Sequence, residues 1–281
     1  MGHRSKELVM PKEKVLITVK TYPSLSAKYD ELVCTAGFKE DGTWIRIFPV
    51  QFRKKKYGQQ YSKYQWVEID LVKNTSDFRK ESYRPVSHET EIKIIGEIKP
   101  DGDDWSERRK IVLNNVYTSL GKLIAEAKNK EIGTSLAVFK PTEIVNLEIK
   151  QVDREWSKEK LDKLNQLNLF ESSDKDGKFE VVKKLPYKFS YKLKDSEGTS
   201  STMMIEDWEI GQLYWNSLKR HGGDEKLACE DVRKKYVDDF ARTKDLHLFL
   251  GTTKLHHNTA PNPFVIIGTF HPKPTTQTSL F

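Results

Sequence analysis

The chain has 281 residues, of which 37% are hydrophobic and 11% aromatic, and this composition excludes wholesale disorder because it can form a folded core. It carries 48 Lys and Arg against 41 Asp and Glu, which gives a formal charge of +7. A net positive charge favours a polyanionic partner, nucleic acid first, because phosphate contacts release counterions.

The first hundred residues predict mainly β-strands. Runs rich in β-branched residues occur at residues 14–22, 31–38, 43–50, 64–72 and 89–99. Asp41-Gly42 separates the second run from the third and predicts a hairpin turn. Short strands at this spacing predict a curved antiparallel sheet or a small barrel.

Residues 100–130 change to the spacing of a helix. One face of this helix would carry Ile111, Val112, Val116, Leu120, Leu123 and Ile124. Strands are expected again at residues 135–141 and 145–153. We therefore predict a β-rich first domain with one helix over residues 1–153, as a candidate nucleic-acid-binding domain.

Residues 154–271 predict a second domain that mixes helices and strands, so the fold class expected is α+β. Helices are expected at residues 157–170, 205–221 and 224–243, the last two joined by Gly222-Gly223. Strands are expected at residues 179–185, 187–195, 245–253 and 264–271, and a loop at residues 171–178.

Residues 272–281 show no periodic apolar positions and predict an extended tail. The tail closes on Gln277-Thr278-Ser279-Leu280-Phe281. This pentapeptide resembles the motif by which bacterial replication and repair proteins bind the β sliding clamp: Gln, any residue, Ser or Asp, Leu, then Phe or Leu.

The resemblance implies a role for each constrained position of the pentapeptide. Leu280 and Phe281 would enter a shared apolar pocket on the clamp. Gln277 would fix the register through its amide, which donates and accepts hydrogen bonds, and Ser279 would hold the local bend. The resemblance covers five residues and implies nothing about the fold of the other 276.

Basic and aromatic residues interleave in the first domain, which is what a groove for single-stranded nucleic acid requires. The candidates for nucleic-acid contact are Trp44, Arg46, Arg53, Lys54, Lys55, Lys56, Tyr57, Arg79 and Arg84. The alternative is that the aromatic residues belong to the core of a barrel and the cations to a solvated hairpin.

A metal-dependent nuclease would need carboxylates and a lysine on adjoining strands. Asp70, Glu97 and Lys99 offer such a set, but similar triplets recur at residues 91–93 and 148–150. His247, His256 and His271 are candidate metal ligands, although their spacing matches no zinc pattern and surface histidines explain them as well. No metal is therefore assigned.

Several classes of protein are disfavoured by what the sequence lacks. Two cysteines, Cys34 and Cys229, support neither a disulfide framework nor a four-cysteine zinc site. No run of about eighteen apolar residues and no secretion signal is present, so we expect no membrane association and a cytoplasmic location. No glycine-rich phosphate loop occurs, and no cofactor is expected.

Three functions remain open at this stage. The first is a DNA-associated accessory protein of replication, repair, a phage or a mobile element, tethered to the sliding clamp. The second is a metal-dependent nuclease acting on DNA or RNA. The third is a protein-interaction factor that does not contact nucleic acid.

Overall fold

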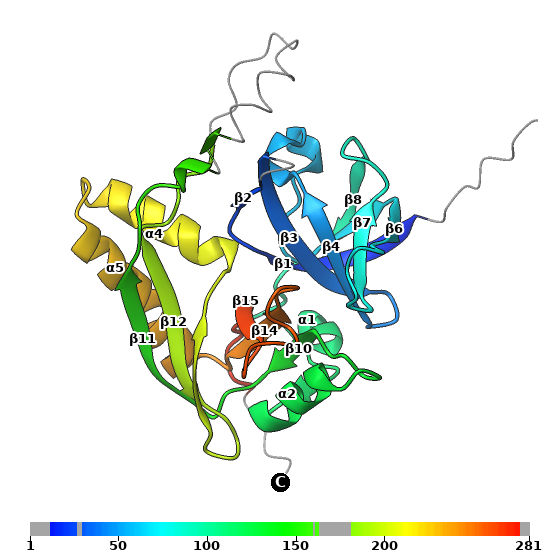
Figure 1. The fold of residues 1–281 in the computed structure, drawn as a ribbon. Coiled ribbons are helices and arrows are strands. Elements are labelled where there is room, and N and C mark those ends of the chain that lie inside the picture. Colours follow the sequence, from blue (N-terminus) through cyan, green and yellow to red (C-terminus); the bar gives the residue numbers. More distant parts are fainter. Residues whose placement is uncertain (1–11, 27–29, 160, 163–180, 276–281) are drawn as a thin grey trace, which may run out of the picture.

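The computed structural model describes residues 12–26, 30–159, 161–162 and 181–275. The fold is α+β, as predicted, with a curled half-barrel sheet in the N-terminal part and an α/β region in the C-terminal part (Figure 1).

The N-terminal sheet has the strand order β6-β7-β4-β3-β1-β5-β8, and β2 pairs with β3. Its neighbours are antiparallel except for β4 and β7, which run parallel. The strands are β1 (Glu13–Lys20), β2 (Ser24–Ser26), β3 (Asp30–Lys39), β4 (Trp44–Val50), β5 (Gln65–Ile69), β6 (Leu71–Lys73), β7 (Ser82–Pro85) and β8 (Ile92–Glu97).

The predicted hairpin turn at Asp41-Gly42 is confirmed between β3 and β4. Gly42 has a φ of 79°, a conformation that glycine adopts without a steric cost. The turn closes with a 2.9 Å hydrogen bond from Lys39 N to Thr43 O, and Asp41 accepts from Thr43 N at 2.9 Å.

The single helix predicted over residues 100–130 is wrong. This segment forms α1 (Ser106–Val112), the short strand β9 (Val116–Tyr117) and α2 (Leu120–Lys128). The Ser119 side chain accepts a hydrogen bond from Lys122 N and starts α2 anew. The residues before it pair with β10, so tertiary pairing overrides the helical spacing.

The C-terminal part contains two further sheets. The first has the order β15-β14-β10-β9 and adds β10 (Leu136–Phe139), β14 (His247–Thr252) and β15 (Phe264–Phe270). The second is an antiparallel sheet of β11 (Glu143–Gln151), β12 (Tyr187–Lys194) and β13 (Ser200–Met204). Residues 181–185, predicted as part of a strand, lie in no strand.

Three helical segments pack against these sheets: α4 (Trp208–Arg220), α5 (Glu225–Arg233) and the π-helix η3 (Lys234–Ala241). Helix α4 approaches the N-terminal part closely at Gly211. A side chain there would overlap the ring of Tyr22, because its Cβ would lie 2.2 Å from Tyr22 Cδ2.

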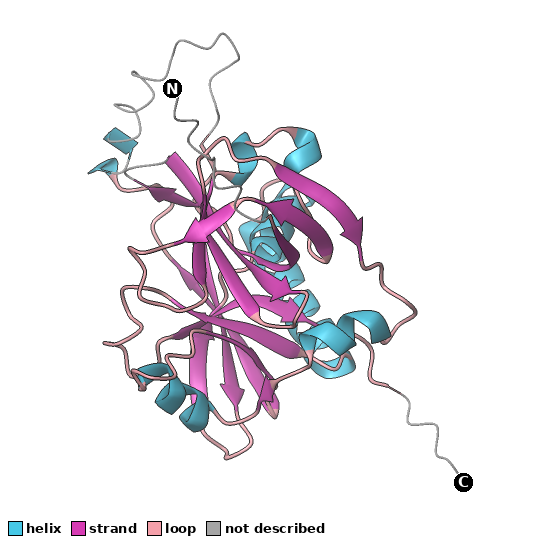
Figure 2. Ribbon diagram, turned by 90° about the vertical axis from the view of Figure 1, so that its right-hand side faces the viewer, coloured by secondary structure: helices cyan, strands magenta, loops and turns pink. Residues whose placement is uncertain are grey.

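The core joins the two parts of the molecule. One apolar cluster, which includes Val15, Ile17 and Ile45, fills the curl of the N-terminal sheet. A second packs Val19 and Phe38 of that sheet against Phe249 on β14. A third lies between the C-terminal sheets and the helices. Figure 1 shows β10, β14 and β15 beside the N-terminal sheet, and Figure 2 shows the molecule from the side, with strands in both parts.

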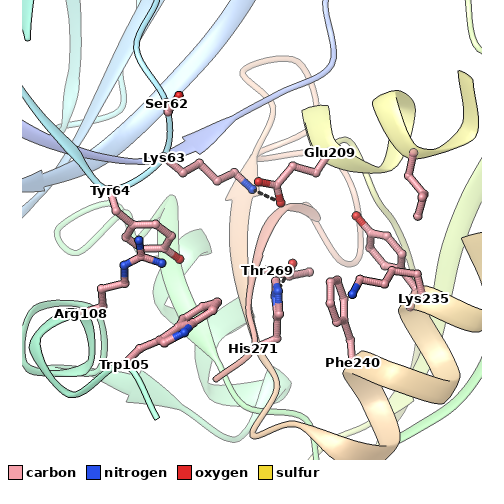
Figure 3. Close-up of a pocket in the computed structure, with 12 residues that line it drawn as sticks. Ser62, Lys63, Tyr64, Trp105, Arg108, Glu209, Lys235, Phe240, Thr269 and His271 are labelled. Atoms are coloured by element: carbon pink, nitrogen blue, oxygen red, sulfur yellow. Dashed lines mark hydrogen bonds and ion pairs between the residues drawn. The ribbon is translucent and has the colours of Figure 1, made fainter. Parts of the chain in front are cut away.

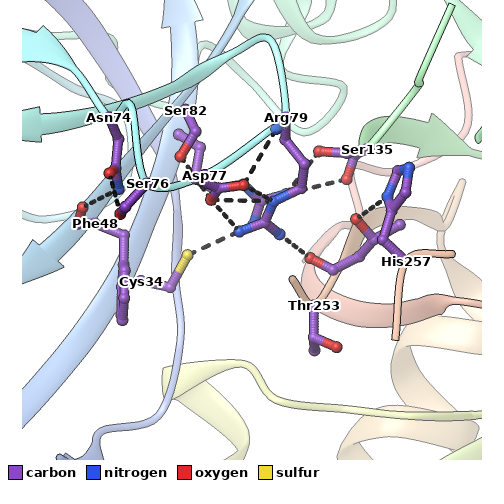
Figure 4. A network of polar contacts seen from close by, with 12 residues as sticks. Cys34, Phe48, Asn74, Ser76, Asp77, Arg79, Ser82, Ser135, Thr253 and His257 are labelled. Carbon is purple, nitrogen blue, oxygen red and sulfur yellow. Dashed lines mark hydrogen bonds and ion pairs between the residues drawn. The ribbon is translucent and has the colours of Figure 1, made fainter. Parts of the chain in front are cut away.

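Buried polar contacts also cross between the two parts (Figure 4). Arg79 donates to both carboxylate oxygens of Asp77 and to the carbonyl of Thr252 on β14. Arg46 on β4 donates to Ser135 O at 3.1 Å. Burial would raise the pKa of Asp77, but the hydrogen bonds and charge of Arg79 lower it to about 2. The carboxylate is therefore ionised at neutral pH.

Candidate functional site

A pocket of about 460 Å³ opens where the N-terminal sheet meets α4 and η3 (Figure 3). This volume lies in the range of about 300–1,000 Å³ that is common for small-ligand sites. Its aromatic residues are Tyr64, Trp105, Tyr236, Phe240 and His271, and its charged residues are Lys63, Arg108, Glu209 and Lys235.

Two residues of one wall have a left-handed backbone. The φ angle is 66° at Tyr64 and 54° at Trp105, and no other non-glycine residue in the described ranges has a positive φ. This conformation is uncommon for bulky residues and costs about 1–3 kcal/mol each. Strain of this kind concentrates at functional sites. Its occurrence twice at one pocket marks the pocket as a candidate site.

Arg108 fixes the rings of this wall. Its guanidinium carbon lies 3.9 Å from the centroid of the Tyr64 ring and 5.0 Å from that of Trp105, which are cation–π contacts. Its Nε donates to Ile98 O at 2.8 Å. Arg108 is 7% exposed, so the guanidinium is held between the two rings and the backbone.

The opposite wall carries a stacked pair, His271 on Phe240. Their ring centroids are 3.6 Å apart, and the ring planes are inclined by 24°. The Trp105 ring meets His271 edge-on at 5.3 Å and so links the two walls. The pocket is thus bounded by a continuous series of aromatic rings (Figure 3).

The π-helix η3 shapes this second wall. Residues five apart lie about 140° apart around an α-helix, so they would face different directions. In η3, the ammonium of Lys235 nevertheless lies 4.9 Å from the centroid of the Phe240 ring. The wider π-turn allows Lys235 and Phe240 to share one face. Such turns are rare and recur at functional sites.

An ion network with a buried pair at its centre lies at the edge of the pocket. Lys63 Nζ lies 2.9 Å from each carboxylate oxygen of Asp207 and 2.9 Å from Glu209 Oε2. The side chains of Lys63 and Asp207 are 8% and 0% exposed, whereas that of Glu209 is 49% exposed. Asp207 also caps α4, since it accepts from Glu209 N.

Burial and charge act in opposite directions on this pair. Burial alone would lower the pKa of the Lys63 ammonium, but Asp207 and Glu209 outweigh it and raise that pKa. Burial raises the pKa of Asp207 to about 6, against the attraction of Lys63. Nearby, burial and the charge of Lys63 lower the pKa of Lys20 to about 8.

The Tyr64 hydroxyl is buried and has no hydrogen-bond partner among the described residues. Figure 3 shows it pointing towards the space between the two walls. A buried polar atom that lacks a partner is costly, about 1–3 kcal/mol. A ligand in the pocket could supply the missing partner.

The structure divides the predicted nucleic-acid residues into two groups. Lys54, Lys56 and Tyr57 are exposed on the segment between β4 and β5, and Arg84 is exposed on β7. On the same segment, Arg53 pairs with Glu31 at 2.6 Å, and Lys55 donates to His88 O and Thr90 O at 2.6 Å and 2.8 Å.

The second group is buried or half-buried. Arg46 and Arg79 are 3% and 6% exposed. Arg79 belongs to the network of Figure 4, and Arg46 donates to Ser135 of the same network. Trp44 packs against Phe38 and Phe249, with centroid distances of 4.1 Å and 5.8 Å. These three side chains connect the parts of the fold.

The nuclease candidates Asp70, Glu97 and Lys99 are not brought together. In the β5–β8 register Gln65 faces Glu97, whereas Ile69, next to Asp70, faces Ile92. Asp70 and Glu97 therefore lie at opposite ends of this ladder, about 17 Å apart along the strand at about 3.3 Å per residue. Lys99 is exposed beyond the end of β8.

The three candidate histidines occupy different surroundings. His247 is buried on β14, with its Nδ1 3.0 Å from Asp245 O; His256 is exposed in the loop before β15; and His271 lines the pocket. Within residues 12–275, gaps aside, no cluster of three or more His, Cys, Asp or Glu could hold a metal ion.

The predicted clamp-binding residues Gln277, Ser279, Leu280 and Phe281 lie outside the described residues. Their role stays a prediction.

Sequence reasoning missed the pocket as a site. Its residues come from five separate segments, and only the fold brings them together. A partial signal exists, because Tyr64 lies within residues 43–66, where basic and aromatic residues interleave. No local sequence pattern marks Trp105 or Arg108, because a left-handed backbone conformation at a tryptophan cannot be recognised from the sequence.

Two family models match the chain. One, described as Domain of unknown function (DUF8758), matches residues 11–114, and the other, described as Domain of unknown function (DUF8757), matches residues 116–281. The chain belongs to the DUF8757 family. The models meet near residue 115, whereas the sequence placed a boundary after residue 153, which stays a prediction.

No curated protein matches the chain. The chain is similar to a solved structure described as a murine DNA-binding protein bound with double-stranded DNA. The match covers 95% of this chain and 98% of the chain in that structure. The identity is 10% and the TM-score 0.31, so this likeness does not establish a shared fold. In the described residues, no helix has the length and apolar character needed to cross a membrane.

We predict that the pKa of His271 lies well below that of an ordinary histidine. Burial lowers its pKa from 6.5 to about 4, although Glu209 opposes the shift. The unfolded chain takes up the proton first as the pH falls. The folded state therefore loses about 3 kcal/mol of stability between pH 6.5 and 4 through this group.

An NMR titration of the imidazole signals checks this prediction, with the His271 signal assigned by its loss in His271→Gln. His256→Gln, at an exposed position, is the control. A His271 midpoint at pH 6 or above would contradict the prediction.

Proposed function

We propose that the protein is a DNA-associated accessory factor of replication, repair, a phage or a mobile element, tethered to the sliding clamp by its C-terminal peptide. The observation that carries DNA association is the exposed basic segment between β4 and β5. Lys54 and Lys56 are exposed there, and Tyr57 is 94% exposed. Cations beside an exposed ring suit a nucleic-acid backbone and its bases.

This segment is held in place by its own contacts. Phe52 is buried beneath it, with its ring centroid 4.9 Å from that of Tyr61 and 5.5 Å from that of Trp208. Gln60 Nε2 donates to Lys55 O at 2.8 Å. A backbone fixed in this way loses little further backbone entropy when its cations bind a ligand.

The net charge of +7 supports the same partner, because it attracts a polyanion over distance. The clamp peptide would add a second attachment. Tethering raises the local concentration of DNA around the body, so a weak DNA contact suffices.

We predict that Lys54→Gln/Lys56→Gln weakens DNA binding and lowers its salt dependence. Each lost phosphate contact reduces the slope of log affinity against log salt by about 0.9, so the slope falls by about 2. Fluorescence anisotropy with a labelled duplex at several salt concentrations measures this slope.

Lys128→Gln/Lys130→Gln is the matched control, because both lysines are exposed at the end of α2 with the same spacing. An equal loss in the control, or an unchanged slope in Lys54→Gln/Lys56→Gln, would show that the segment does not bind DNA.

We predict that Leu280→Ala/Phe281→Ala abolishes binding to purified β sliding clamp, because both apolar anchors of the peptide are removed. Thr276→Ala/Thr278→Ala should bind as the wild type does, since the motif leaves Thr278 unconstrained and does not include Thr276. A pull-down measures both. Clamp retention by the first variant would reject the tether and leave DNA association untouched.

A further inference from the structure

We propose that the pocket of Figure 3 receives a single nucleobase unstacked from a DNA strand. This inference rests on the proposed DNA association and names what the aromatic pocket would bind.

Aromatic rings line two sides of the pocket and offer apolar surface to a base. Tyr64 and Trp105 form one wall, and the stacked pair of His271 and Phe240 forms the other. Every base offers a π-face, and stacking on a protein ring contributes about 1–3 kcal/mol per base. The contacts of the Arg108 guanidinium with Tyr64 and Trp105 hold these rings in place before any ligand arrives.

The polar groups suit the edge of a base better than a purely anionic ligand. The unpartnered Tyr64 hydroxyl can donate to a ring nitrogen or a carbonyl. Half-exposed Glu209 can accept from an exocyclic amine, whereas it would repel a ligand that carries only negative charge. Exposed Lys235 stands at the pocket and can meet a phosphate.

The pocket follows the basic segment directly in the chain. Lys54 and Lys56 lie eight and six residues before Ser62, so they are at most about 29 Å and 22 Å from it. Phosphates of one strand are about 3.4 Å apart along a duplex, so these distances correspond to at most about eight and six nucleotides. A strand bound at Lys54 and Lys56 can therefore present a nearby base to the pocket.

The experiment compares three labelled duplexes of one sequence: fully paired, with one unpaired base, and with an abasic residue at that position. Extruding a base is easiest where it is already unpaired. The wild type should bind the unpaired-base duplex about tenfold more tightly than the other two. The readout is the ratio of Kd values at one salt concentration.

Trp105→Gly should reduce this preference to less than about twofold. Glycine accepts the left-handed backbone of Trp105, so the variant removes the ring without adding strain. Phe78→Ala, which truncates an aromatic side chain that is 53% exposed elsewhere, is the control and should keep the full preference.

Tyr64→Phe provides a second test, which leaves the aromatic ring in place. It removes only a hydroxyl that has no partner in the described structure, so denaturant stability should not fall. The preference for the unpaired base should drop about fivefold if that hydroxyl bonds the base. An unchanged preference in both Tyr64→Phe and Trp105→Gly overturns the proposal.

The remaining outcomes separate this inference from the proposed function. Absence of salt-dependent DNA binding rejects both. Salt-dependent binding with equal affinity for the three duplexes rejects the base pocket alone. A third outcome is that micromolar free deoxynucleoside monophosphate displaces the labelled duplex while the three duplexes bind equally. This outcome would identify the pocket as a site for free nucleotides and would also reject the proposal that it binds a base of a DNA strand.

Discussion

The ion pair of Lys63 and Asp207 is the contact on which the candidate site depends. It joins the turn before β5 in the N-terminal sheet to the cap of α4 in the C-terminal part, with both side chains almost fully buried. Removing one partner of such a pair leaves an uncompensated charge in the interior, which is far more costly than losing an exposed pair. The ion pair therefore fixes the position of the N-terminal sheet relative to α4 at the edge of the pocket.

The pocket residues follow from this constraint. Lys63 precedes Tyr64, whose left-handed backbone directs its ring against Arg108. On the other side, the ion pair fixes the start of α4 and with it Glu209. The backbone strain at Tyr64 and the π-turn of η3 each cost free energy locally, and the packing around them compensates for this cost. Aromatic surface, cations and an unpartnered hydroxyl are thereby gathered in one cavity.

The sequence predicted the fold better than the site. The hairpin at Asp41-Gly42 and the α+β class follow from local patterns, and both are confirmed. The helix expected over residues 100–130 is broken because β9 pairs with β10, a long-range contact that spacing does not reveal. The pocket was missed since its residues come from distant segments. In the sequence, Arg46 and Arg79 resemble surface cations. In the fold they are buried and connect the two parts of the molecule.

A double-mutant cycle on Lys63 and Asp207 tests the central claim most directly. Urea unfolding at pH 7.5 would be measured for Lys63→Met, Asp207→Asn and the double variant. Each single change should cost about 3–5 kcal/mol, and the double variant should cost at least about 2 kcal/mol less than the sum. Single costs below about 1 kcal/mol that simply add would show that the pair does not hold the two parts together.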